Sequence, residues 1–291
     1  MDIGHATGLG TQPVALRSAV AADAEACGRI MHDAFEEISS AHDFPKDFPS
    51  REAGIALAKA MIADTQVFGV VAEAGGHVIG SNFLDERDEV RAVGPITVDP
   101  RWQDGGVGRR LMQAVLDHAE GAASVRLVQA GYHMRSLALY ASLGFEVKAP
   151  LLLLDGQPRG ALPAGARVRP MTEADVPACD ALCATAHGIS RRNELQAAVR
   201  RFGPVVLERR GRILAYLTAP ELWLMNHGVA ETEQDMAALL AGAAALQGRP
   251  VALLLPSRQA GLLRWCLAAG MRAVQPLTLM ARGSWRVPAR C

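Results

Sequence analysis

The chain has 291 residues, of which 50% are hydrophobic and 21% charged, and its formal net charge is zero. This balance gives no electrostatic support for binding to nucleic acid or to a membrane surface. The length is typical of two domains of about 150 residues each, and the hydrophobic content is sufficient for two packed cores.

The cysteines and the hydropathy of the chain bear on its compartment. The five cysteines are odd in number and lack the spacing of a disulfide framework, so we expect reduced thiols. Cys179 and Cys183 lie four residues apart, but no second pair of ligands follows them, so we predict no metal site. The N-terminus has no secretory signal, and no run approaches about 18 apolar residues. The sequence therefore predicts a cytoplasmic protein that binds neither nucleic acid nor membrane.

Strands and helices alternate through the first half of the chain. We expect residues 1–12 to be a disordered lead-in, and a helix to begin at Asp23 after a short strand. The predicted elements, in chain order, are a strand at 14–17, helices at 23–38 and 51–64, and a hairpin of strands at 68–73 and 78–84. The loop 42–50 is rich in proline and aromatic residues, and its phenylalanines pack either on the core or on a substrate.

An apolar, β-branched run at 93–98 leads into the turn Gln103–Arg110, and an amphipathic helix leads out of it. A strand, a glycine turn and a helix N-terminus in this order form an anion site, because backbone N–H groups converge there and the helix dipole favours negative charge. Glycines let a phosphate approach closely. Arg109 and Arg110 oppose the dipole unless an anion is bound. The apolar face of the helix consists of Leu111, Met112, Val115, Leu116 and Ala119.

Beyond this helix the chain completes one pattern and then repeats it. We expect a strand at 125–128, a helix at 135–143 that ends at Gly144, closing strands at 145–147 and 150–154, and a linker at 156–165. The motifs Leu16-Arg17, Ala22-Asp23 and Ala26-Cys27 then recur as Val168-Arg169, Ala174-Asp175 and Ala178-Cys179. The chain is therefore predicted to be a duplication, with a first and a second copy of one domain.

The glycine turn does not recur in the second copy. Its counterpart near Asn226–Glu231 has neither paired glycines nor arginines, and the position that matches Tyr140 is Cys266. We predict that the second copy keeps the scaffold and lacks the anion site.

Two motifs in this order resemble the GCN5-related N-acetyltransferase (GNAT) family. The first is Gln103-x-x-Gly106-x-Gly108, preceded by Val98 and followed by Leu111. The second is Ser136-Leu137-Ala138-Leu139-Tyr140 with Leu143-Gly144-Phe145. The resemblance implies an α/β fold with a central mixed sheet flanked by helices, present as two GNAT-like domains in tandem. The implied domains are a catalytic one at 13–155 and a degenerate one at 166–283, followed by a tail at 284–291.

The same resemblance implies acetyl-CoA as the co-substrate and Tyr140 as the general acid that protonates the departing CoA thiolate. A phenol's pKa of about 10 lies near that of a thiol, which suits this role. The family often has asparagine seven residues before the tyrosine, where this chain has His133. The residues implied to bind the cofactor are Ile96, Thr97, Val98, Gln103, Asp104, Gly105, Gly106, Val107, Gly108, Arg109, Arg110, His133 and Ser136.

The general base and the acceptor site are less closely defined by the motifs. Glu86, beside the strand that leads to the cleft, is the candidate base, and Asp85, Glu89 and His133 are alternatives. The candidates for contact with the acceptor, in the aromatic loop, are His42, Asp43, Phe44 and Phe48.

We therefore expect an N-acetyltransferase that acts on the primary amine of a small molecule or peptide by direct attack in a ternary complex, as a monomer or homodimer. The alternative is a non-catalytic acyl-CoA-binding sensor or interaction module, because one copy already keeps the scaffold without the motif. A P-loop enzyme is excluded because Gly-x-x-x-x-Gly-Lys-Ser/Thr is absent. A Rossmann dehydrogenase is excluded because Leu111 stands where a third glycine is needed.

Overall fold

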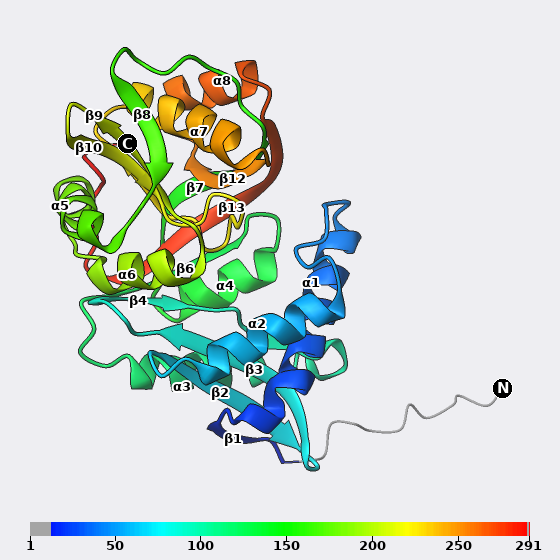
Figure 1. The fold of residues 1–291 in the computed structure, drawn as a ribbon. Helices are drawn as coiled ribbons and strands as arrows, with labels where there is room; N and C mark the ends of the chain where they lie inside the picture. Colours follow the sequence, from blue (N-terminus) through cyan, green and yellow to red (C-terminus); the bar gives the residue numbers. More distant parts are fainter. Residues whose placement is uncertain (1–12, 290) are drawn as a thin grey trace. The chain divides into compact units, whose positions relative to one another are not determined.

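The computed structural model describes residues 13–289 and 291, so the predicted lead-in at 1–12 lies outside the described part of the chain. The described residues form two compact units, shown with the whole ribbon in Figure 1. Unit 1 contains residues 13–86 and 91–127, and unit 2 contains residues 87–90 and the remainder from 128 onward. Among the described helices, none combines the length and the hydropathy needed to cross a bilayer.

Unit 1 follows the predicted order of elements. Its strands are β1 (Ala15–Ser18), β2 (Val67–Ala74), β3 (His77–Asp85) and β5 (Thr97–Val98), while β4 (Val90–Val93) and β6 (Ser124–Ala130) have residues in both units. Its helices are the short 3₁₀ helices η1 (Ala21–Asp23) and η2 (Pro100–Trp102) and the α-helices α1 (Ala24–Ala41), α2 (Arg51–Ala63) and α3 (Val107–His118). β2 pairs antiparallel with β1 and, through the Gly75-Gly76 turn, with β3. The predicted hairpin and helices are confirmed.

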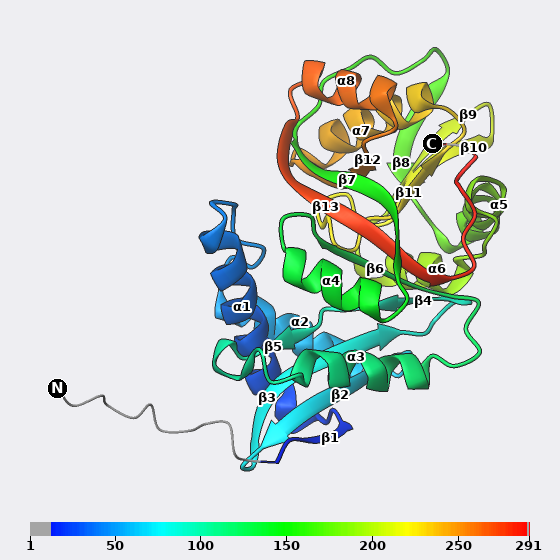
Figure 2. The same ribbon diagram turned by 180° about the vertical axis from the view of Figure 1, so that it is seen from behind.

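Helices α1 and α2 cover one face of β2 and β3, and α3 covers the other face (Figures 1 and 2). The predicted apolar face of α1 is the buried one, since Cys27 and Met31 are fully buried and pack with Phe83. Glycine is required at Gly28, because a Cβ there would overlap the Cα of Ile55 in α2. The two helices therefore meet backbone to backbone at this point.

The strand predicted at 93–98 is shorter than expected. β4 ends at Val93, the Gly94–Pro95 peptide bond is cis, and β5 consists of two residues. Pro95 has no N–H to donate to a neighbouring strand, which explains the interruption. The 3₁₀ helix η2, whose first turn is capped by the Asp99 carboxylate, then separates β5 from the glycine turn.

Unit 2 contains the rest of the first copy and the whole second copy. Its strands are β7 (Glu146–Gly156), β8 (Ala166–Pro170), β9 (Val205–Arg209), β10 (Arg212–Leu217), β11 (Gly228–Ala230), β12 (Val251–Pro256) and β13 (Arg272–Gly283). Its helices are α4 (Met134–Ser142), η3 (Glu173–Asp175), α5 (Val176–His187), α6 (Arg192–Arg201), α7 (Glu233–Gln247) and α8 (Ala260–Ala268). The two closing strands predicted at 145–147 and 150–154 are a single strand, β7, which also includes the first residue of the predicted linker.

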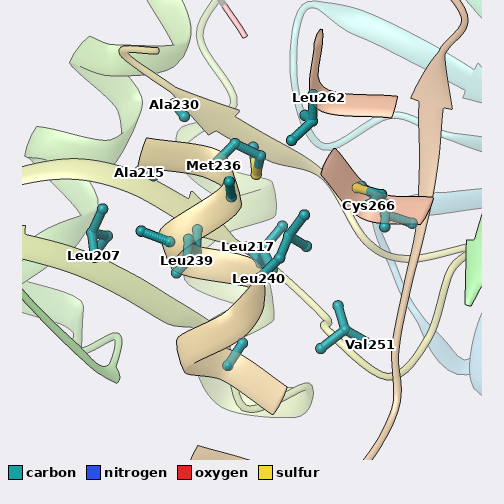
Figure 3. Packing of buried hydrophobic residues seen from close by; sticks show 14 of the residues in the cluster. Leu207, Ala215, Leu217, Ala230, Met236, Leu239, Leu240, Val251, Leu262 and Cys266 are labelled. Carbon is teal, nitrogen blue, oxygen red and sulfur yellow. The ribbon is translucent and has the colours of Figure 1, made fainter. Parts of the chain in front are cut away.

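Residues of β9 and β10 alternate between two cores. Leu207 and Leu217 pack with Leu240 of α7 on one face, as Figure 3 shows. Val206 and Tyr216 pack with residues of α5 and α6 on the other face. Because successive side chains of a strand point to opposite faces, one sheet separates α7 from the α5–α6 pair. The sheet order is β11-β10-β9-β8.

The two copies share an ion-pair network that confirms the predicted repeat. The Arg17 guanidinium donates to both Asp23 carboxylate oxygens, at 2.7 and 2.9 Å, and to Glu73 at 2.9 Å. In the second copy, the Arg169 guanidinium donates to both Asp175 carboxylate oxygens, at 2.7 and 2.8 Å, and to Glu208 at 2.7 Å.

Removing the carboxylate of this network from the second copy is expected to change the pH dependence of stability. Arg169 holds the pKa of Asp175 at about 2, below its usual 3.8. Because the folded pKa lies below the unfolded one, the stabilisation is present above about pH 4 and is lost as the pH falls through about 2. Asp175→Asn should lower the free energy of unfolding by about 2 kcal/mol at pH 7 and by much less at pH 2. Urea denaturation at both pH values measures this, and an equal loss at both would contradict it.

The last strand of the first copy, β7, lies between two strands of the second copy. β7 pairs antiparallel with β12 on one side and with β13 on the other. Two further hydrogen bonds join the two copies in the same region. Gly131 N–H of the first copy donates to the Pro276 carbonyl of the second at 2.9 Å, and Ser257 N–H of the second copy donates to the Pro150 carbonyl of the first at 3.0 Å. The boundaries of the two units therefore fall at other residues than the predicted domain boundaries, which remain a prediction.

Candidate functional site

The glycine turn of unit 1 ends at the N-terminus of α3. Gly106 is the N-cap of α3, with a φ of 76° and no side chain to cap the helix. A Cβ at Gly106 would meet no described atom within 4 Å, so the space in front of the helix is open. The first turn, Val107–Arg110, contains no acidic residue. A helix N-terminus of this kind offers backbone N–H donors and the positive end of its dipole to an anion.

Side chains of the turn connect it to neighbouring segments. The Gln103 amide donates to the Val98 carbonyl at 3.3 Å, which links the turn to β5. Arg110 donates to the Val14 carbonyl at 2.9 Å, and both Arg109 and Arg110 are exposed. The predicted residues Gln103–Arg110 thus lie together at one helix end, and two of them, Arg109 and Arg110, are cations.

The predicted cofactor residues Ile96, Thr97 and Val98 lie at and just before β5. β5 pairs with β3, with Val98 opposite Gly80. Glycine is needed there, because a Cβ at Gly80 would lie 2.8 Å from the Thr97 carbonyl oxygen. Thr97 is buried, whereas Ile96 and Val98 are half-buried. Contact of these residues with a cofactor remains a prediction.

The equivalent helix of the second copy, α7, has a different N-terminus. Thr232 is its N-cap, and the Thr232 hydroxyl accepts a hydrogen bond from the Asp235 N–H at 3.1 Å. Glu233 and Asp235 place two carboxylates in the first turn. Only Glu231 and Thr232 connect β11 to α7, where residues 99–106 connect β5 to α3. The protein's own groups satisfy this N-terminus, and its acids repel an anion.

Tyr140 lies on α4, the helix predicted at 135–143, and this part of the chain belongs to unit 2. Its side chain is buried, and its ring packs edge to face on Phe145 with centroids 6.2 Å apart. Burial raises the pKa of Tyr140 well above its usual range. The hydroxyl is therefore protonated at neutral pH and available as a hydrogen-bond donor. Its pKa lies further above that of a thiol than the pKa of an exposed phenol does, so the close match expected from the sequence is not found.

Gln129 lies on β6 in unit 2 and was not among the predicted site residues. Gln129 is 6% exposed, and its Nε2 has no hydrogen-bond partner among the described residues. The Ser136 hydroxyl lies 2.9 Å from both the Gln129 Oε1 and the His133 carbonyl, so Ser136 orients Gln129. A buried amide donor without an acceptor costs about 1–3 kcal/mol unless a ligand satisfies it. No local pattern marks Gln129, because only the fold places it beside Ser136.

The second copy replaces this polar group by hydrophobic residues. The positions of Gln129, Ser136 and Tyr140 correspond to Leu255, Leu262 and Cys266. All three are buried in the cluster that Figure 3 shows around α7. The second copy therefore lacks both the open helix end and the polar groups of the first.

The candidate base Glu86 has two partners in unit 1. Its carboxylate lies 2.6 Å from the Arg91 guanidinium and 3.1 Å from His118 Nε2. The His118 ring is stacked on Phe68 with centroids 3.7 Å apart. The role of Glu86 as base remains a prediction, and its partners imply that it would act together with His118.

Other acids of the predicted acidic connection have a structural role in unit 2. The Asp88 carboxylate accepts hydrogen bonds from the N–H groups of Asn193 and Glu194, at 3.1 and 3.0 Å. Glu89 accepts one from the Ser190 N–H at 3.3 Å. These contacts stabilise the start of α6, which favours a structural role for Glu89 over the alternative role as a base.

The aromatic loop combines core and surface residues. Phe48 is half-buried, and its ring contacts Phe35 edge to face with centroids 5.5 Å apart. Phe44 is also half-buried, while His42 and Asp43 are exposed. Phe48 thus packs on the core, and His42 and Asp43 are better placed to meet an acceptor. All four contacts with an acceptor remain predictions.

Among the described residues, one group on α1 has the spacing of metal ligands. Ligand atoms of His32, Asp33 and Glu36 lie within 4.8 Å of one another. Asp33 forms an ion pair with Arg51 at 2.9 Å, and Glu36 forms one with Lys46. These cations neutralise both carboxylates, so the group is explained as an ion-pair network.

Residues 29–145 match the model of the Acetyltransferase (GNAT) family, and this range includes the glycine turn and Tyr140. Residues 29–145 form a domain of the GNAT family. N-alpha-acetyltransferase RimI of Mycobacterium tuberculosis is a relative with 29% identity over 143 residues, covering 47% of this chain and 80% of that protein. The matched region is therefore an acetyltransferase domain.

Two solved structures share the fold over nearly the whole chain. A putative acetyltransferase from Pyrococcus horikoshii has a TM-score of 0.73 and 17% identity, covering 97% of this chain and 93% of that one. A tandem GNAT protein from the clavulanic acid biosynthesis pathway has a TM-score of 0.58 and 13% identity, covering 92% and 98%. The predicted fold class, two GNAT-like domains in tandem with a central mixed sheet flanked by helices, is confirmed.

Proposed function

We propose that this GNAT protein is an acetyl-CoA-dependent N-acetyltransferase with one cofactor site, which belongs to the first copy, residues 13–155. The contrast between two equivalent helix N-termini carries the proposal. α3 is capped by Gly106 and has two arginines in its first turn, whereas α7 is capped by Thr232 and has two acids there. The second copy, residues 166–283, then contributes scaffold and no cofactor site.

The residues of the first copy fit acetyl-CoA. The N-terminus of α3 supplies backbone donors and two cations for the pyrophosphate. In unit 1, Val98 offers main-chain groups to the pantetheine arm. In unit 2, Gln129 Nε2 is a buried donor without a partner among the described residues. When bound, acetyl-CoA supplies an acetyl group activated as a thioester.

In the proposed mechanism, a neutral acceptor amine attacks the thioester carbonyl directly in a ternary complex. Tyr140 is the proposed acid that protonates the departing sulfur, and its hydroxyl is protonated at neutral pH because burial raises its pKa. Glu86, with His118 beside it, is the candidate to remove a proton from the amine, and His133 and Asp85 are alternatives. Holding both reactants together lowers the barrier by roughly 7–11 kcal/mol, and a positioned acid contributes about 10²–10⁴-fold.

The acceptor that we propose is a primary amine of a small molecule or peptide. The RimI relative is named an N-alpha-acetyltransferase, which supports including peptide N-termini among the candidates. The exposed Asp43 carboxylate and His42 suit a cationic acceptor, with Phe44 and Phe48 nearby in the chain. We further propose that the enzyme is cytoplasmic and acts as a monomer or homodimer.

Thiol release from acetyl-CoA with a panel of amines tests this function. The panel contains peptide N-termini, amino acids, polyamines and aminoglycosides, and the acetylated product is identified by mass spectrometry. We expect release that depends on one class of amine. Binding of acetyl-CoA without turnover on any amine would instead support the second candidate function, a non-catalytic acyl-CoA sensor. That candidate is kept because the second copy has the scaffold without the motif.

A further inference from the structure

The described residues of the segment that follows β13, 284–289 and 291, turn back along unit 2. The Ala289 N–H donates to the Ala186 carbonyl, near the end of α5, at 2.8 Å. The Cys291 carbonyl accepts a hydrogen bond from the Ala230 N–H of β11 at 2.6 Å. In both Figure 1 and Figure 2 the segment passes α5 and ends beside β10. The segment therefore contacts the edge strand of the second copy.

The residue that it contacts, Ala230, is the counterpart of Val98. In the first copy Val98 lies opposite Gly80, and the next residue, Asp99, donates its N–H to the Ile79 carbonyl at 2.9 Å. The second copy repeats both features. Ala230 lies opposite Ala215, and the next residue, Glu231, donates its N–H to the Leu214 carbonyl at 2.9 Å. The Ala230 N–H thus has the position of the Val98 N–H in the fold.

Other contacts of the segment lie at positions that correspond to predicted site residues of the first copy. The Cys291 thiol lies 3.6 Å from the Oε1 of Gln259, which is the counterpart of His133. Cys291 packs on the hydrophobic cluster that contains Cys266, the counterpart of Tyr140. The Glu233 carboxylate of α7 lies against α8, because a Cβ at Gly261 would overlap it. The segment thus contacts the counterparts of Val98 and His133 and packs on the cluster that contains the counterpart of Tyr140.

We propose that the second copy contains a peptide-binding site, formed by the edge of β11 and the start of α8, and that residues 284–289 and 291 of the chain occupy it. The site binds an extended peptide whose main-chain carbonyl accepts from Ala230 and whose small thiol or apolar side chain packs on the cluster around Cys266. It corresponds in position to β5 and the start of α4 in the first copy. These contacts do not depend on whether the first copy acetylates amines.

Thiol labelling of the full chain tests whether the segment is bound. Burial raises the pKa of Cys291 to about 12, so a bound Cys291 reacts slowly with iodoacetamide. We expect Cys291 to be labelled at least about 100-fold more slowly in the native chain than in the urea-unfolded chain. Peptide mapping distinguishes its labelling from that of the other cysteines. Ala230→Pro removes the N–H donor and should accelerate Cys291 labelling at least about tenfold, whereas Ala230→Gly keeps the donor and should not. Labelling of native Cys291 at the unfolded rate would overturn the proposal.

Adding the segment as a separate peptide tests the site itself. A chain that ends at residue 283 should melt at a lower temperature than the full chain, and a synthetic peptide of residues 284–291 should bind it one to one and restore the melting temperature. A scrambled peptide is the control. An unchanged melting temperature together with no peptide binding would overturn the proposal, as would binding of two acetyl-CoA molecules to the shortened chain. If the shortened chain does not fold, the labelling of the full chain decides.

Discussion

Replacing Gly106 with valine is expected to weaken acetyl-CoA binding by about 10²–10⁴-fold. A side chain at this position would fill the open space in front of α3, where no described atom lies within 4 Å of a Cβ. It would separate the pyrophosphate from the helix N–H donors, and the loss of two charge-assisted hydrogen bonds of about 1.5–3 kcal/mol each gives this range. Calorimetric titration of the variant with acetyl-CoA measures the effect.

Gly76→Val is the matched control for this experiment. Gly76 in the β2–β3 turn has a φ of 77°, compared with 76° at Gly106, and a Cβ there also meets nothing within 4 Å. Both variants should therefore lose a similar stability, about 1–2 kcal/mol, from the left-handed backbone. Only the Gly106 variant should lose affinity. If it binds as the wild type does, or if Gly76→Val weakens binding equally, the site is assigned to the wrong turn.

Tyr140→Phe is expected to reduce kcat by about 10²–10⁴-fold while leaving the dissociation constant of acetyl-CoA nearly unchanged. The substitution removes only the hydroxyl, and the ring keeps its edge-to-face contact with Phe145. The rate falls because the leaving thiolate loses its hydrogen-bond donor. Thiol release with the best amine of the panel gives kcat, and titration gives the dissociation constant.

Tyr216→Phe in the second copy controls for the loss of a buried phenol. The Tyr216 hydroxyl lies 3.0 Å from His227 Nδ1, and its side chain is fully buried. This variant should lose about 1 kcal/mol of stability and keep its activity. Full activity of Tyr140→Phe would exclude Tyr140 as the acid. Inactivity of both variants would show that the second copy takes part in catalysis.

The sequence predicted the features that depend on near neighbours in the chain. The N-cap glycine Gly106, the apolar face of α3 and the C-terminal glycine Gly144 each depend on a few consecutive residues. The repeat was visible because Arg17 and Arg169 precede aspartates at the same spacing. Tyr140 was found because a family motif surrounds it.

The features that the sequence did not predict depend on residues far apart in the chain. Gln129 gains meaning only when β6 and α4 come together and leave its Nε2 without a partner among the described residues. Asp88 caps a helix that starts about a hundred residues later, so it resembled an ordinary surface acid. Hydrophobic periodicity showed that β7 is buried but could not show which strands lie beside it.

The position of β7 between β12 and β13 has a consequence for the integrity of the chain. If the two copies were separate molecules, β7 of one would have to insert between β12 and β13 of the other, and the fraction of molecules paired in this way would fall on dilution. In one chain, the segment 157–165 holds the exchanging strands at an effective concentration on the order of millimolar, so their pairing does not depend on dilution. A protease that cuts this segment after folding would therefore leave two fragments that stay associated and separate only on unfolding.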